Sequence, residues 1–113
     1  MYPSYLARIA STAERACAMA LDRPKDRQAR EQLFDALASV ADPSFQADEP
    51  EFDHLADLFS QARVWANIVR TRITGLQTNK LGHPALKAVQ FPARDLLPIL
   101  GDLSRELGRR NDA

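Results

Sequence analysis

The chain offers few side chains of the kinds that enzymes use for catalysis or metal binding. Its two histidines, His54 and His83, lie far apart, and its one cysteine, Cys17, lies in an alanine-rich run with no histidine nearby. A zinc site needs several closely placed ligands, and a reactive cysteine needs a group that lowers the pKa of its thiol. We therefore expect no catalytic residue, metal or cofactor, and we interpret Cys17 as a small buried hydrophobic residue.

His54 is the one histidine with acidic neighbours, Glu51, Asp53 and Asp57. Without a second histidine this group would make a poor zinc site. Carboxylates at the start of a helix are favoured by the helix dipole, so we interpret the group as a solvated helix start. His83 precedes Pro84 and is expected to cap the next helix. With only four glycines, none in a phosphate-binding loop, the sequence predicts a protein that is not an enzyme.

The charged residues are segregated, although fifteen basic and fifteen acidic side chains give zero net charge. From Asp42 to Asp57 there are carboxylates and no lysine or arginine, whereas from Arg63 to Arg94 there are cations and no carboxylate. A polar face of one expected helix, formed by Arg63, Asn67, Arg70 and Thr74, could follow a phosphate backbone. Two alternatives stay open. In the first, the cations are only the solvated outer face of a helix, and in the second, they pair with the acidic region of another copy of the chain. Head-to-tail pairing of copies in this way would close the assembly into a ring.

Four helices would position these residues, at about 4–21, 24–41, 49–75 and 84–108. The breaks follow from Pro24, from Asp42-Pro43 and from Gly75, and a capping box formed by Asp48 and Glu51 marks the third start. No segment shows the alternation of a strand. The sequence therefore predicts a single all-α domain over residues 1–113, in which the third and fourth helices form a long antiparallel hairpin.

The last helix carries the clearest pattern. Apolar residues recur at intervals of three and four, which is a heptad seam, at Leu86, Val89, Ala93, Leu96, Leu100, Leu103 and Leu107. Pro92 and Pro98 lie inside the pattern but off the seam. A mid-helix proline costs roughly 3 kcal/mol and burial of a leucine contributes about 1.5–3 kcal/mol, so we expect one long helix, kinked at the prolines.

Two segments are candidates for contact between subunits. Residues 64–69 are apolar on nearly all faces of the third helix, which is typical of a central helix or of a subunit contact, and a bent last helix could curve against a neighbouring copy. The predicted interface residues are Trp65, Ile68, Leu96, Leu100 and Leu103. The sequence does not decide whether Trp65 lies in the core of one subunit or between two subunits.

Over residues 29–108 the order of features resembles one family of terminase small subunits from tailed bacteriophages. In that family a helix rich in alanine and aromatic residues is followed by a short turn near a glycine. An Asn-Pro or His-Pro start and a long final helix ending in Glu-Leu-Gly come next. Before these features the family has a helix that ends ahead of an acidic opening. The corresponding segments here are 30–41, 52–75, 81–86, which contains His83-Pro84-Ala85-Leu86, and 100–108, which ends in Glu106-Leu107-Gly108. The family's usual Thr-Pro and arginine tail is replaced by Arg109-Arg110-Asn111, and the alanine-rich first helix differs from the family's usual start.

The resemblance implies a non-catalytic ring oligomer that binds phage DNA and delivers it to a large terminase subunit, which carries the ATPase and nuclease. The cations that it implies for DNA contact are Arg63, Arg70, Arg72, Lys80 and Lys87. Asn67, which lies on the same helical face as Arg63 and Arg70, is added to them as a candidate DNA contact. The departure at the tail leaves contact with the large subunit open.

A different class of function is a small helical module, such as a prophage or satellite inhibitor or adaptor, that binds another protein and not DNA. A helix-turn-helix regulator fits less well, because residues 42–50 do not form the tight turn of that motif. The single cysteine, the absence of a signal pattern and the absence of an apolar run of about 18 residues predict a cytoplasmic protein without membrane contact.

Overall fold

The structure is a computed structural model that describes residues 5–47, 50–78 and 83–112. These residues form α1 (Tyr5–Asp22), α2 (Arg27–Ala41), a short 3-10 helix η1 (Pro50–Leu55), α3 (Ala56–Thr78) and α4 (His83–Asp112). The described part of the chain contains no strand. The predicted all-α fold with four main helices is confirmed.

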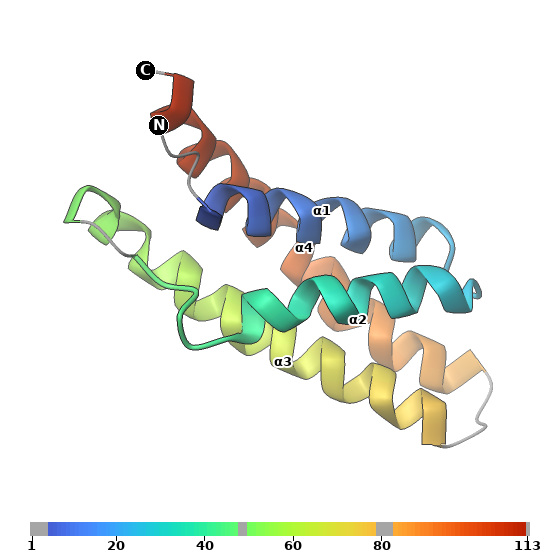
Figure 1. Cartoon of the computed structure of the whole chain (residues 1–113). Helices are drawn as coiled ribbons and strands as arrows, with labels where there is room; N and C mark the ends of the chain where they lie inside the picture. Colours follow the sequence, from blue (N-terminus) through green and yellow to red (C-terminus); the bar gives the residue numbers. More distant parts are fainter. Residues whose placement is uncertain (1–4, 48–49, 79–82, 113) are drawn as a thin grey trace.

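The four helices form an elongated bundle in which each packs against two others (Figure 1). The α3–α4 hairpin is present as predicted, and α4 also packs closely against α1, so α4 has a neighbour on either side. The α1–α2 connection, the last turn of α3 and the first turn of α4 lie at the same end of the bundle, on the right in Figure 1. Residues about 60 positions apart in the sequence thereby share one end of the molecule.

Small residues allow α1 to approach α4 closely. Ala10, Ala13 and Cys17 are fully buried. On α4, Gly101 is buried, and a Cβ atom there would lie only 2.9 Å from Oε2 of Glu14. The alanine-rich face of α1 thus provides the thin contact surface that its composition predicts.

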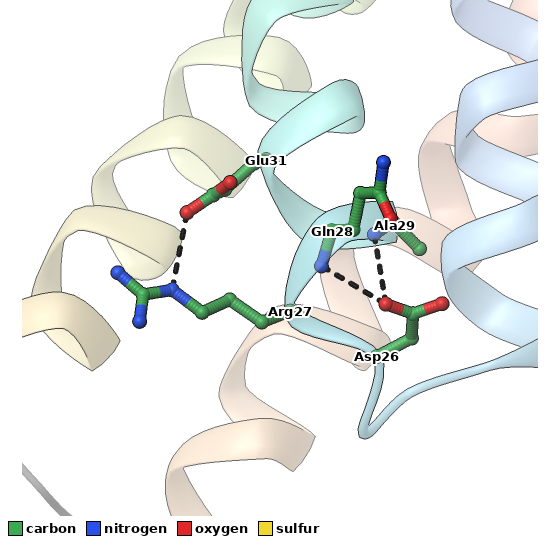
Figure 2. Close-up of polar contacts among 5 residues, drawn as sticks. All are labelled: Asp26, Arg27, Gln28, Ala29 and Glu31. Atoms are coloured by element: carbon green, nitrogen blue, oxygen red, sulfur yellow. Dashed lines mark hydrogen bonds and ion pairs between the residues drawn. The ribbon is translucent and has the colours of Figure 1, made fainter.

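The second helix begins three residues later than expected, at Arg27, because Asp26 is its N-cap. The Asp26 carboxylate accepts hydrogen bonds from the backbone N–H groups of Gln28 (2.9 Å) and Ala29 (3.3 Å), as Figure 2 shows. A side-chain oxygen at this position satisfies donors that have no partner within the helix. An exposed ion pair between Arg27 and Glu31 (3.1 Å) follows in the next turn.

The third helical segment differs from the prediction at both ends. It opens as the 3-10 helix η1 before α3 begins at Ala56, and Asp48 of the predicted capping box lies outside the described residues. Gly75 does not end the helix, which continues to Thr78. A terminating glycine takes a positive φ, and none of the described glycines does.

Helix α4 runs through Pro92 and Pro98 as one element. The heptad residues from Val89 to Leu107 are buried as the spacing predicts: Val89, Ala93, Leu96, Leu100, Leu103 and Leu107. The kink at the prolines stays a prediction. The core between the helices is completed by residues such as Phe45, which is fully buried and lies edge-on to Phe59 with ring centroids 4.9 Å apart.

Candidate functional surface

The α3 face that the sequence assigns to DNA is turned toward α2. Nη1 of Arg63 donates a hydrogen bond to the Phe45 carbonyl (2.6 Å). Nε of Arg70 donates to the Phe34 carbonyl (3.3 Å), and its guanidinium carbon lies 4.2 Å from the centroid of the Phe34 ring. Both arginines are partly buried. They therefore hold α3 to α2 and to the loop after it, and the face they share is not an open cationic surface.

Asn67, on the same face, is exposed, and its side-chain amide donates to the Arg63 carbonyl (3.1 Å) within α3. Lys80 lies outside the described residues. Of the six predicted DNA contacts, Arg72 and Lys87 remain as exposed cations in the described part of the chain.

Arg72 links α3 to α4 through a hydrogen bond to a backbone carbonyl of α4, that of Ala88, which lacks its usual hydrogen-bond donor within its own helix. Its Nη1 donates to the Ala88 carbonyl (3.0 Å). In a helix this carbonyl would accept from the N–H of residue 92, but Pro92 has no N–H. The guanidinium thus supplies the hydrogen bond that the proline removes.

We expect the Arg72→Met variant to lose about 1 kcal/mol of the free energy of unfolding, the scale of one partly solvated hydrogen bond. In a Pro92→Ala background the same change should cost much less, because the N–H restored at position 92 can bind the Ala88 carbonyl. Urea unfolding of the four proteins in this double-mutant cycle measures the difference. Arg27→Met, which removes an exposed ion pair, is the control. Equal losses in both backgrounds would contradict the proposed coupling.

An exposed stripe remains on α4, formed by Lys87, Phe91 and Arg94, which we call the α4 stripe. Spacings of four and three residues place its members on one helical face. Phe91 is 59% exposed, and the guanidinium carbon of Arg94 lies 5.9 Å from its ring centroid. The stripe therefore presents two cations and an aromatic ring to solvent. Phe91 and Arg94 are candidate site residues that the sequence-based assignment of DNA contacts missed.

The α1–α2 connection, which contains the exposed Arg23 and Lys25, lies at the end of the bundle where α4 begins (Figure 1). A small hollow lined by Pro24, Arg30, Leu86 and other residues shows that this connection touches the first described turns of α4. Nη1 of Arg30 donates a hydrogen bond to the Pro24 carbonyl (2.8 Å), which holds the α1–α2 connection against α2. Nothing in the local sequence signals this contact between the connection and α4, because it depends on the order in which the helices pack.

Carboxylates gather at the opposite end of the bundle. Asp53 and Asp57 are exposed in η1 and the first turn of α3. In the loop before them, Asp42 accepts hydrogen bonds from the backbone N–H (2.8 Å) and the hydroxyl (2.7 Å) of Ser44. These bonds stabilise the charged form and hold the pKa of the Asp42 carboxyl below its usual range. The described carboxylates of the acidic run thus lie in the loop after α2, in η1 and at the start of α3, at the other end of α3 from Arg72.

The predicted subunit interface needs a correction at three positions. Leu96, Leu100 and Leu103 have no exposed surface in a single chain, because α4 is packed between α1 and α3. They lie in the core of a single chain, and none of their surface is exposed for contact with a second chain. Trp65 and Ile68 are partly buried, and Trp65 packs against the core, while neighbouring Val64 is 55% exposed.

The described residues contain no group of three or more histidine, cysteine, aspartate or glutamate side chains that could hold a metal ion. His54 is exposed, and the side chain of His83 lies outside the described set. The Cys17 thiol is buried and donates to the Ala93 carbonyl (3.3 Å). Burial, with a smaller contribution from Glu14, raises the pKa of this thiol to about 12.

Comparison of the chain with protein-family models, with curated proteins and with solved structures finds no match. None of the helices in the described ranges is long and apolar enough to cross a membrane.

Proposed function

We propose that this chain is a non-catalytic, oligomeric DNA-binding subunit for viral genome packaging, similar in role to a terminase small subunit. The observation that carries the DNA-binding part is the α4 stripe, with two exposed cations two helical turns apart. The packaging role, the partnership with a large terminase subunit and the assembly of several copies rest on the family resemblance at the start and end of α4.

The proposed DNA surface is the end of the bundle where the α1–α2 connection lies against the first described turns of α4, extended along α4. Lys87 and Arg94 provide the stripe contacts, Arg72 lies on the adjacent helix, and Arg23 and Lys25 are exposed in the α1–α2 connection at this end. Arg72 keeps further guanidinium donors beyond the one bound to Ala88. Cations spread in this way suit a phosphate backbone, whose contacts position a protein without reading sequence. The acidic end of the bundle would point away from DNA.

The Lys87→Gln/Arg94→Gln variant should bind duplex DNA more weakly than the parent chain and with a smaller dependence on salt. Each phosphate contact contributes about −0.9 to the slope of log K against log salt concentration, so loss of two contacts should reduce the slope by about 2. Fluorescence anisotropy of a labelled duplex at several salt concentrations measures this. The control, Arg27→Gln/Arg105→Gln, removes the same charge from two exposed arginines that are paired with carboxylates within their own helices, and it should leave the slope unchanged. Equal slopes for the two variants would overturn the proposed surface.

A second candidate function is a helical module that binds another protein. Val64 and Phe91, 55% and 59% exposed on α3 and α4, favour it, since aromatic and apolar residues are enriched where partner proteins dock. This candidate predicts no DNA affinity even at low salt. Light scattering of the purified chain separates the two further, because a stable monomer would remove the packaging proposal and leave the second candidate standing.

A further inference from the structure

A second cationic feature lies away from the α4 stripe, in a surface hollow of about 380 Å³ between α1 and the last turns of α4. The hollow is lined by two arginines, three hydroxyl side chains and two small residues: Arg8, Arg15, Ser11, Thr12, Ser104, Ala7 and Gly108. No carboxylate is among them. Its volume falls within the range of about 300–1,000 Å³ that is usual for small-molecule sites.

The guanidinium groups of the two arginines that line the hollow are available to bind a ligand. Among the described residues, neither Arg8 nor Arg15 has a hydrogen-bond or ion-pair partner. Six of the other eight arginines whose side chains the structure describes have such a partner. Arg27 and Arg105 pair with carboxylates, and Arg30, Arg63, Arg70 and Arg72 bind backbone carbonyls. Two unpaired guanidinium groups that border one hollow are therefore a distinctive feature of this part of α1.

The spacing of the arginines suits a ligand that carries more than one negative oxygen. They lie seven positions apart, which is two turns, or about 10 Å, along one face of the helix. Ser11 and Thr12 lie between them on α1, and Ser104 faces them from α4. Guanidinium groups bind phosphate through paired N–H donors, and hydroxyl groups can donate to the remaining oxygens.

From this arrangement we infer that the hollow between α1 and α4 binds a small phosphate-bearing molecule, of the diphosphate or phosphate-ester class. Arg8 and Arg15 hold the phosphate oxygens from the two ends of the hollow. Ser11, Thr12 and Ser104 donate to them from its sides. Gly108, where a Cβ atom would meet nothing within 4 Å, leaves room for the rest of the ligand. The site does not depend on the proposed DNA surface.

Titration of the full chain with inorganic pyrophosphate, followed by NMR of the backbone amides, tests this site. We expect the amide signals of Ser11, Thr12 and Ser104 to move with a Kd of about 1 mM or tighter. Arg8→Gln and Arg15→Gln should each weaken binding about tenfold, the usual scale for loss of one charge-assisted hydrogen bond. Both side chains project from the outer surface of α1, so the variants should fold, which circular dichroism checks.

Arg23→Gln, the same change at the other end of the bundle, is the matched control and should leave pyrophosphate affinity unchanged. An equal loss in this control, or the absence of signal changes in the parent chain, would overturn the site. Citrate is the carboxylate probe, and binding as tight as that of pyrophosphate would overturn the assignment to phosphate. The Lys87→Gln/Arg94→Gln variant should retain pyrophosphate binding, so failure here and failure of the DNA proposal are separate results.

Discussion

Replacement of Leu100 by alanine is expected to lower the free energy of unfolding by about 2–5 kcal/mol, the range measured for loss of a fully buried leucine. Leu100 has no exposed surface, and it lies in the middle of the α4 seam between α1 and α3. The alanine would leave a cavity that the closely packed neighbours can only partly fill. For a domain whose whole stability is about 5–15 kcal/mol, this is a large fraction.

The same experiment separates a core residue from a subunit contact. A core role makes the loss independent of protein concentration, whereas a leucine buried only between subunits would affect unfolding in a concentration-dependent way. Urea unfolding at two protein concentrations, widely spaced, gives the answer. Val64→Ala, at a position 55% exposed, should change stability by no more than about 0.5 kcal/mol. A loss for Leu100→Ala that disappears on dilution would restore the interface prediction.

The buried Cys17 thiol should make the folded protein less stable as the pH rises above about 9. The unfolded chain releases this proton near the ordinary pKa of 9.0, while the folded chain holds it up to a pKa of about 12. The folded state therefore binds more protons between these values, and the free energy of unfolding falls as pH increases. At about 1.4 kcal/mol per pKa unit, the contribution amounts to roughly 2 kcal/mol at pH 10.5.

Unfolding in urea from pH 7.5 to 10.5 measures this contribution against a control that cannot titrate. Cys17→Ala keeps a small side chain at the site and should lose less stability over the same range, since its remaining pH dependence comes from the other groups. A thiol reagent at pH 8 should react with the folded parent chain only as fast as the chain opens, because the thiolate is the reactive form. Parallel pH profiles for parent and variant, or rapid labelling of the folded chain, would contradict the buried, protonated thiol.

Much of the fold could be predicted because it depends on local spacing. The intervals of three and four from Val89 to Leu107 predict both a helix and the side of it that is buried, and the structure agrees at each of these positions. The alanine-rich face of the first helix predicts close packing, which occurs against α4. The helix ends were less predictable, since Pro24 suits a helix start but Asp26 provides the cap that forms.

For the candidate DNA surface, the sequence predicted the positive charge but not which of the cations are exposed. The run of cations from Arg63 to Arg94 is plain in the sequence, but whether a guanidinium meets solvent or a neighbouring backbone depends on which helix lies beside it. Arg70 is next to α2, so it stacks on Phe34, whereas Arg94 lies on an outer face of α4. A long side chain can reach partners over several ångströms, and sequence spacing within one helix does not identify them.

The sequence by itself therefore determined the number of main helices, the buried stripe of α4 and the segregation of charge, because each of these follows from residue types and their intervals along the chain. Only the tertiary structure decided that Leu96, Leu100 and Leu103 lie inside one subunit, that Arg72 binds the carbonyl freed by Pro92, and that the α1–α2 connection shares an end with the start of α4. These features join segments distant in sequence, and their geometry exists only once the four helices have packed.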